Sequence, residues 1–260
     1  MKIIRRLLLL FCILGLISCG TIGGKSQTAA DAKTTWRSRQ FNWASYIDYS
    51  SPEKYLSPGM LSDLSQEKFE MVQSYFEKRV KPKTKVDIIN GIYKYMKDGN
   101  NFSSYAAGGA LIAKRTVGQI FEEKTLSGCH DWGLVLCTLL RKFNIPAVYV
   151  DSALVGWAQN YIDGIGGSFE GHIFVEAFVD GRWILLNSTN ALAIKDYDPL
   201  NPLLGFCEKG TNYFVMFKGL DPWDYGIYSN EDVQNAMKKG ARQIITDSKK
   251  APKPGNVSRI

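Results

Sequence analysis

Hydrophobic and polar positions follow different rules in the two halves of this chain. Between residues 62 and 143, apolar side chains recur every three or four positions, the spacing of helices that bury one face. From residue 147 onward they form short runs separated by glycine, proline and aspartate, which is typical of strands and turns. The pattern predicts helices followed by strands, and no internal repeat is visible.

Four helical segments are predicted before residue 144. The first begins near Ser62, the second follows Pro82, the third is short and spans 115–123, and the fourth begins beside Cys129. The apolar faces of the first, second and fourth are Phe69, Val72, Tyr75 and Phe76, then Val86, Ile89, Ile92, Tyr93 and Met96, and finally Leu136, Leu139, Leu140 and Phe143. The fourth helix should therefore be anchored in the core.

A β-hairpin is the clearest strand signal. Residues 171–179 and 182–188 are rich in strand-forming side chains, and they flank Asp180-Gly181, a pair that favours a two-residue turn. Two shorter strands are predicted, at 147–150 and 213–217. The glycine-rich segment 153–169 predicts a mobile connection that could serve as a lid.

The N-terminus carries the features of a targeting segment. Residues 1–18 have a basic start and an apolar run that is short for a membrane span, which is typical of a secretory signal. Leu16-Ile17-Ser18-Cys19 resembles the bacterial lipoprotein box, and this resemblance implies cleavage before Cys19 and lipid on its thiol. An ordinary secretory signal or an uncleaved anchor is the alternative. Residues 19–35 are small and polar, and they predict a flexible tether.

The rest of the chain predicts one domain with a C-terminal extension. The domain spans 36–228 and opens with an arm over 36–58, in which aromatic residues alternate with serine and proline. A helix capped by Ser229 is expected over 229–247. The basic residues 248–260 are expected to be a disordered tail.

The formal net charge of +7 is carried by the two ends of the chain. Residues 1–18 hold three basic residues and no acidic ones, and residues 238–260 hold seven basic and one acidic, which leaves 19–237 slightly acidic. A nucleic-acid-binding domain needs a basic face on its folded part. Nucleic acid is therefore not an expected partner, and the tail is expected to touch anionic membrane or cell-wall material.

The cysteine count favours one free thiol in the mature protein. Cys12 leaves with the signal and Cys19 would be lipidated, so Cys129, Cys137 and Cys207 remain. An odd cysteine in an oxidising compartment suggests an unpaired thiol. Cys129 would be that thiol if the other two form a disulfide; otherwise both are buried apolar residues.

Cys129 lies where a helix can activate a thiol. Ser127 is a plausible N-cap, which places Cys129 in the first turn, and the positive helix end should lower the pKa of its thiol there. A small buried core residue is the alternative. Cys137 lies two turns further on and is better interpreted as core.

The hairpin predicts the partner of this thiol. With Asp180-Gly181 as the turn, opposed residues have numbers that sum to 361, so Phe174 faces Asn187. Alternation then puts His172 on the same face as a diagonal neighbour of Asn187, within hydrogen-bond reach. An imidazole oriented by an amide can serve a thiol as general base. A lone histidine in an apolar sheet is otherwise a satisfied core residue.

His130 is the only other histidine. Adjacent helical residues point in different directions, so His130 is not expected to serve Cys129 directly. A zinc site made of Cys129, His130 and His172 is conceivable, but no spaced cysteine or histidine pair supports it. We therefore expect no metal and no cofactor.

Three blocks of residues resemble the transglutaminase-like superfamily. They are Arg115-Thr116-Val117 with Gly128-Cys129-His130-Asp131-Trp132 and Asn144-Ile145-Pro146-Ala147, then Gly171-His172-Ile173-Phe174-Val175-Glu176, and finally Asn187-Ser188-Thr189. The match spans about 85–190 and implies an α+β, papain-like core whose nucleophile-bearing helix packs on an antiparallel sheet. It also implies Cys129 as nucleophile, His172 as general base and acid, and Asn187 as the orienting residue. Asn187 stands where this family usually has Asp, and Phe174 where it usually has Trp.

Together these features favour a lipid-anchored enzyme of the bacterial cell envelope. Cys129 would attack an amide carbonyl of a protein, peptide or cell-wall substrate and form an acyl-enzyme. Water outnumbers amines at a cell surface, so hydrolysis by a peptidase or amidase is favoured over amine transfer. The alternative is a catalytically degenerate domain that binds or scaffolds envelope partners.

Overall fold

The computed structural model describes residues 46–105, 109–206 and 212–260. The chain divides into two units, residues 1–35 and 36–260, and every described residue belongs to the second. The predicted signal peptide, the lipidated Cys19 and the tether therefore lie outside the described residues. None of the described helices is long and apolar enough to cross a membrane.

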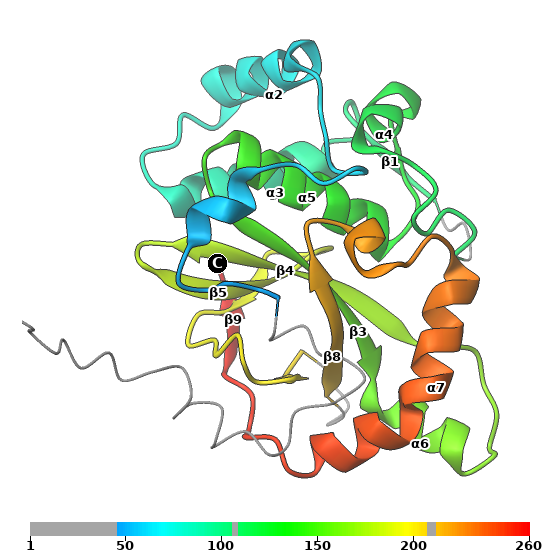
Figure 1. Cartoon of the computed structure of the whole chain (residues 1–260). Helices are drawn as coiled ribbons and strands as arrows, with labels where there is room; N and C mark the ends of the chain where they lie inside the picture. The colour runs from blue at the N-terminus through cyan, green and yellow to red at the C-terminus, as the bar shows by residue number, and fades with distance from the viewer. Residues whose placement is uncertain (1–45, 106–108, 207–211) are drawn as a thin grey trace, which may run out of the picture. The chain divides into compact units, whose positions relative to one another are not determined.

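A seven-stranded antiparallel sheet forms the centre of the second unit (Figure 1). Its strand order is β7-β8-β3-β4-β5-β6-β9, and β1 and β2 form a separate parallel pair. The strands are β1 Ser103–Ser104, β2 Thr125–Leu126, β3 Ala147–Leu154, β4 Gly171–Val179, β5 Arg182–Asn187, β6 Leu192–Ile194, β7 Leu203–Leu204, β8 Tyr213–Gly219 and β9 Val257–Arg259.

Helices cover both faces of this sheet. They are η2 Pro52–Leu56, α2 Gln66–Arg79, α3 Lys85–Lys97, α4 Val117–Glu123, α5 Cys129–Lys142, α6 Val155–Ile162, η3 Pro222–Tyr225 and α7 Asn230–Ser248. Strand alternation divides the core. Tyr149 and Ile173 join the core of α2 to α5, whereas Val150 and Phe174 join that of α6 and α7. The fold is α+β, as the family resemblance implied.

A close approach between α5 and the sheet sets the position of the helix. Gly133 lies one turn after Cys129, and a Cβ atom there would be 2.4 Å from Ile173 Cγ2 and 2.9 Å from Tyr149 Cε2. Real atoms do not come this close, so only glycine lets the helix lie at this depth. Gly133 thereby holds Cys129 near the start of β4.

The hairpin forms with the predicted register. Phe174 pairs with Asn187, Ala177 with Ile184, and the turn residues Asp180 and Gly181 have φ of 50° and 83°. Positive φ at both central positions is the type I′ turn that Asp-Gly favours, and it specifies a two-residue loop. The turn therefore fixes which side chains share a face.

The connection between β3 and β4 is more structured than its glycines predict. Residues 155–162 form helix α6, in which Trp157 and Ala158 are buried in the core shared with α7. The prediction of a mobile connection over 153–169 is therefore wrong for this part, because apolar burial outweighs the low helical signal of a short segment.

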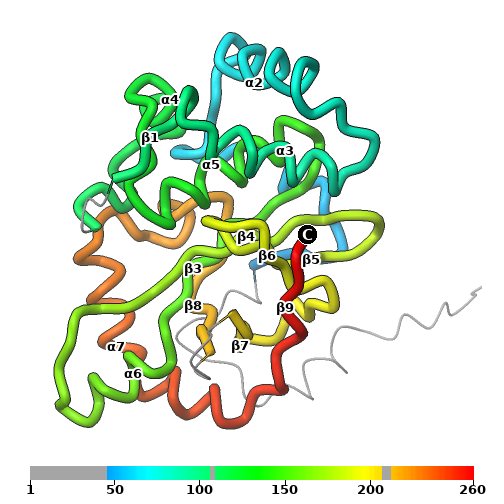
Figure 2. Tube along the Cα trace, turned by 180° about the vertical axis from the view of Figure 1, so that it is seen from behind, coloured from blue at the N-terminus to red at the C-terminus, as the bar shows by residue number. Residues whose placement is uncertain are grey.

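The C-terminal tail is also ordered, in contrast to the prediction of disorder over 248–260. Helix α7 ends at Ser248, and β9 pairs with β6 at the edge of the sheet (Figure 2). The N–H of Ile260 donates to the carbonyl of Ala191 at 3.2 Å, and the Asn90 amide donates to the Ile260 carbonyl at 3.4 Å. The unpaired edge of β6 offers these contacts, which composition alone does not reveal.

The described part of the aromatic arm packs on the sheet. Tyr49 and Tyr55 contact Trp183 edge-on, with ring centroids 5.5 Å and 5.9 Å away. Beside them, a fully buried ion pair joins Lys218 Nζ to Glu176 Oε1 at 2.5 Å, and the Tyr49 hydroxyl lies 2.8 Å from Lys218 Nζ. The arm thus closes a polar network that sequence patterns did not indicate.

Candidate active site

Cys129 is the first residue of α5, and the helix begins differently from the prediction. The N-cap is Gly128, with φ of 147°, a conformation that favours glycine. Ser127 is therefore not the N-cap. Its N–H and hydroxyl instead donate to Asp131 Oδ2, at 2.9 Å and 2.8 Å. The Asp131 carboxylate, in the first turn of the helix, thus binds Ser127, the residue before the N-cap.

Arg115 and Asp131 form a buried anchor under this helix start. The Arg115 guanidinium pairs with Asp131 and Glu123, and it donates to Thr125 Oγ1 at 2.8 Å. Burial alone would raise the pKa of Asp131, but the neighbouring His130 ring and hydrogen bonds from Ser127 hold that pKa below its ordinary value. Arg115 therefore ties α4 and β2 to the residue two positions after Cys129. The sequence showed this pair only as members of a motif.

His172 and Asn187 form the predicted contact, and its polarity can be assigned. His172 Nε2 lies 3.0 Å from Asn187 Oδ1. The backbone N–H and the hydroxyl of Thr189 both donate to the same atom at 3.0 Å. A backbone N–H can only donate, so that atom is oxygen and His172 Nε2 must carry the proton. His172 Nδ1 therefore has its lone pair available as a base.

Three further contacts hold this pair in place. The Tyr93 hydroxyl donates to the backbone carbonyl of Asn187 at 2.6 Å, and the Ser152 hydroxyl donates to that of His172 at 2.6 Å. The His172 ring contacts Phe174 edge-on, with centroids 4.9 Å apart. The imidazole is thus positioned from α3, β3 and its own strand.

Cys129 and His172 line the same cavity, which has a volume of about 500 Å³. The backbone N–H of Ile173, directly after His172, donates toward the Cys129 sulfur. The other walls include Phe169, before β4, and Val233 of α7. The structure therefore brings the predicted nucleophile and base to one cavity that can hold a small substrate group.

The protonation of the pair differs from the prediction. Burial raises the pKa of the Cys129 thiol to about 11, although backbone N–H groups of Ile173, Cys129 and His130 act against it. Burial also lowers the pKa of His172, despite its bond to Asn187. Backbone N–H groups at the helix start do lower the thiol pKa, as expected, but burial is the larger effect, so the net pKa is raised. At neutral pH the Cys129 thiol and the His172 ring are therefore both uncharged.

Asp151 is a residue of the site that the sequence analysis missed. It lies on β3, lines the cavity and is 5% exposed. Burial raises the pKa of its carboxyl to about 7. Its charge is also one cause of the raised pKa of Cys129. The sequence signal that could have revealed it is an aspartate inside the apolar strand 147–154, since aspartate is rarely fully buried unless it has a partner.

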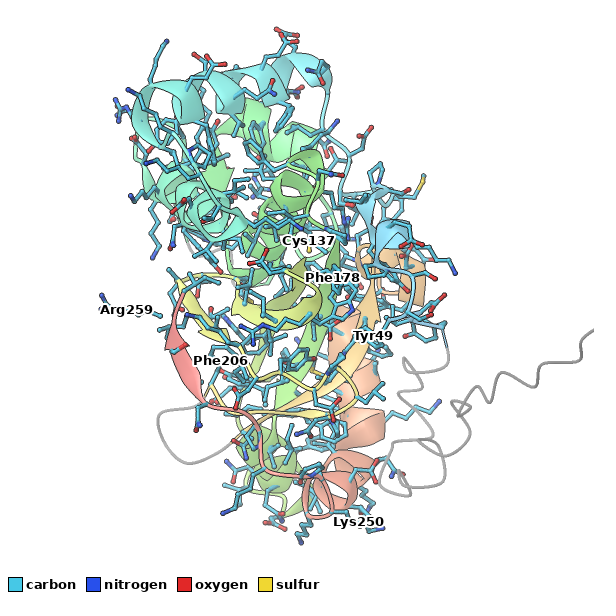
Figure 3. The ribbon with its side chains drawn as sticks, turned by 90° about the vertical axis from the view of Figure 1, so that its left-hand side faces the viewer. Tyr49, Cys137, Phe178, Phe206, Lys250 and Arg259 are labelled. Atoms are coloured by element: carbon cyan, nitrogen blue, oxygen red, sulfur yellow. The ribbon has the colours of Figure 1, made fainter. Side chains whose placement is uncertain are left out.

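The remaining histidine and cysteines have other roles. His130 Nε2 lies 3.1 Å from Asp131 Oδ1, and among the described residues no group of three or more potential metal ligands is assembled. The zinc alternative is therefore not formed there. Cys137 is a free, fully buried thiol (Figure 3), so its disulfide with Cys207 is not formed. Cys207 itself lies outside the described residues.

Comparisons with known proteins give matches only among solved structures. No family model and no curated protein matches the chain. A Cytophaga hutchinsonii protein solved as a candidate cysteine protease is 16% identical, with a TM-score of 0.42, over 84% of this chain and 55% of that one. A TGase structure is 13% identical, with a TM-score of 0.34, over 77% of this chain and 54% of that one.

The chain spans about half the length of each of these structures. The assignment of its fold depends on its own topology, in which Cys129 heads a helix packed on an antiparallel sheet and one hairpin of that sheet carries His172 and Asn187. That arrangement is the one implied by the resemblance of the sequence blocks to the transglutaminase-like superfamily.

Proposed function

We propose that this protein is a cysteine-nucleophile enzyme that attacks amide carbonyls through Cys129. The observation that carries the proposal is the oriented imidazole. Asn187 and Thr189 leave His172 Nδ1 free to accept a proton, and the ring shares a cavity with a thiol at a helix start. A positioned base beside a nucleophile is the requirement for covalent catalysis.

The reaction follows from these positions. As Cys129 Sγ attacks the carbonyl carbon, His172 Nδ1 takes the thiol proton, and the backbone N–H of Cys129 stabilises the developing oxyanion. The C–N bond then breaks, and the imidazolium returns its proton to the leaving amine. Water then attacks the thioester with His172 as base, the C–S bond breaks, and the imidazolium returns the proton to the Cys129 sulfur as the carboxylic acid leaves. Proton transfer accompanies attack, because the resting thiol and ring are both neutral.

Hydrolysis is the favoured outcome of the acyl-enzyme. Water greatly exceeds amines in concentration at a cell surface, so it intercepts the thioester unless an amine is bound in the cavity. A peptidase or amidase is thus proposed before an acyltransferase. The substrate class is an amide of a protein, a peptide or cell-wall material.

The second candidate is a binding or scaffold domain that keeps the residues without turnover. The neutral state of Cys129 and His172 favours it, because a thiol with a raised pKa is a weak resting nucleophile. Asn187, in place of the Asp usual in the family that the sequence blocks resemble, also favours the scaffold, because a neutral amide stabilises the protonated His172 ring less than a carboxylate would.

Mass spectrometry of trapped intermediates separates the two functions. The full chain is incubated with cell-envelope extract, quenched in acid and mapped by peptide. An acyl adduct on Cys129 that is lost in His172→Ala supports catalysis and identifies the acyl group. Cys137, fully buried in the same helix, is the internal control thiol. No adduct on Cys129 in the native chain, with intact binding of envelope material, favours the scaffold.

We further propose that the enzyme is anchored to a bacterial envelope membrane by lipid on Cys19. The support is the order of basic start, apolar run and Leu-Ile-Ser-Cys in residues 1–19. Metabolic labelling with a fatty acid should mark the native chain and not Cys19→Ala. Equal labelling of both would remove the lipoprotein assignment and leave the catalytic proposal untouched.

A further inference from the structure

Asp151 is a buried carboxyl that the proposed chemistry does not use. It lies on β3 between Ile173 of β4 and Phe217 of β8, and it is 5% exposed. The pairing of β3 with β8 shifts register between Asp151 and Ser152, which leaves Met216 as an extra residue. Such irregularities re-aim side chains beside functional sites. Here the side chain forms part of the cavity wall.

No cation pairs with this carboxyl within the described part of the chain. The backbone N–H of Ser152 donates toward it. The titratable groups that influence it are Tyr149 of its own strand, Cys129 of α5 and Tyr225 of η3. None of these groups is positively charged at neutral pH. A buried carboxylate without a partner is costly, and a bound cation would compensate it.

The cavity as a whole has an acidic character. Asp151 and the exposed Glu170 are its acidic lining residues, and the described lining contains no lysine or arginine. Among the described lining residues, the other ionisable side chains are those of His130, His172, Cys129 and two tyrosines. The field inside the cavity therefore favours positive groups, and it disfavours anions.

A cation in this cavity would also affect the nucleophile. The negative charge of Asp151 opposes ionisation of the Cys129 thiol. A positive group placed against Asp151 would cancel that effect at the moment when substrate is bound. Binding of a cationic substrate would then select that substrate and activate the Cys129 thiol at the same time, since only the bound complex would have the more reactive thiol.

We propose that Asp151 is a specificity-determining residue that selects a primary ammonium group close to the reacting carbonyl. The ammonium belongs either to the acyl part of the substrate or to an amine that receives the acyl group once its ammonium has given a proton to His172. The proposal rests on the function proposed for Cys129 and adds the chemical class of its substrate.

Charged thiol reagents test this without knowledge of the substrate. The full chain is treated with the cation 2-aminoethyl methanethiosulfonate or the anion 2-sulfonatoethyl methanethiosulfonate, and modification of Cys129 is followed by peptide-resolved mass spectrometry. The native chain should react faster with the cation. Asp151→Asn should reduce the cation-to-anion rate ratio about tenfold, the size of one pKa unit of interaction. Asp151→Ser is a second variant with the same expected result.

Two controls isolate the buried charge. Asp180→Asn makes the same charge change on the exposed hairpin turn and should leave the ratio as in the native chain. Glu170→Gln removes the acidic group from the cavity rim and should change the ratio less than Asp151→Asn. A ratio in Asp151→Asn equal to that in Asp180→Asn would overturn the proposal.

Protection experiments distinguish the two sources of the ammonium. Alaninamide carries an ammonium beside a carboxamide, whereas propylamine carries the ammonium alone. Protection of Cys129 from iodoacetamide by alaninamide only, lost in Asp151→Asn, assigns the ammonium to the acyl part. Equal protection by propylamine assigns it to the incoming amine, and protection by neither overturns the proposal. The reagent and protection experiments need no turnover. They can therefore fail while the acyl adduct on Cys129 still forms, and they can succeed when no acyl adduct forms.

Discussion

Replacing Asp151 with asparagine should stabilise the protein at neutral pH and leave its stability at acid pH nearly unchanged. The carboxyl is 5% exposed, and burial raises its pKa from 3.8 to about 7. The folded protein therefore holds a proton over this range that the unfolded chain has released. The contribution of this carboxyl to the stability of the fold is fully present below pH 3.8. It is lost as the pH rises through about 7. The shift corresponds to about 4 kcal/mol.

The assay is urea unfolding of the native chain and Asp151→Asn, each at a pH below 3.8 and a pH near 8. The variant should gain up to about 4 kcal/mol over the native chain at the higher pH, because its amide never ionises. Asp180→Asn, on the exposed turn, controls for the change in net charge. If the difference between Asp151→Asn and the native chain is the same at both pH values, the carboxyl is not held in a buried, unpaired state.

Two further predictions concern α5 and its thiol. Gly133→Ala should destabilise the protein by about 1–3 kcal/mol in urea unfolding, because its Cβ would meet the side chain of Ile173 at 2.4 Å. Gly118→Ala in α4 is the control, because its Cβ would be 3.6 Å from the nearest atom, Thr116 Oγ1. This variant should be as stable as the native chain or more stable by up to about 1 kcal/mol. Equal losses of stability in the two variants would refute the close approach at Gly133. The rate of Cys129 alkylation by iodoacetamide should keep rising from neutral pH toward 11, since burial raises the thiol pKa to about 11. A plateau near neutral pH would instead indicate a resting thiolate–imidazolium pair.

The contact between His172 and Asn187 was predictable because it depends on local chemistry. Asp180-Gly181 admits one kind of turn, and that turn specifies the register of every residue behind it. The start of α5 could be predicted to within one residue for a similar reason. The actual cap differs because Asp131 binds Ser127, a contact that competes with capping.

Protonation of the site could not be predicted, since it depends on burial by distant segments. Helix position alone suggests a lowered pKa for Cys129, but Phe169, Tyr213 and Val233 help to enclose the cavity from other parts of the chain. Asp151 was missed for the same reason, because alternation along a strand does not say which end of it borders a cavity. Order in the C-terminal tail likewise depends on β6, more than 60 residues earlier.

Acylation of Cys129 by p-nitrophenyl acetate tests the central claim most directly, because it isolates the first chemical step. The native chain should release one nitrophenolate per active site in a fast phase and carry an acetyl group on Cys129. His172→Ala should slow that phase by about 10²–10⁴-fold, the usual contribution of a general base, while keeping the fold by circular dichroism. Asn187→Asp, which retains an acceptor for His172 Nε2, should keep most of the rate. Acetylation of Cys129 in His172→Ala at the native rate would contradict the assignment of His172 as its base.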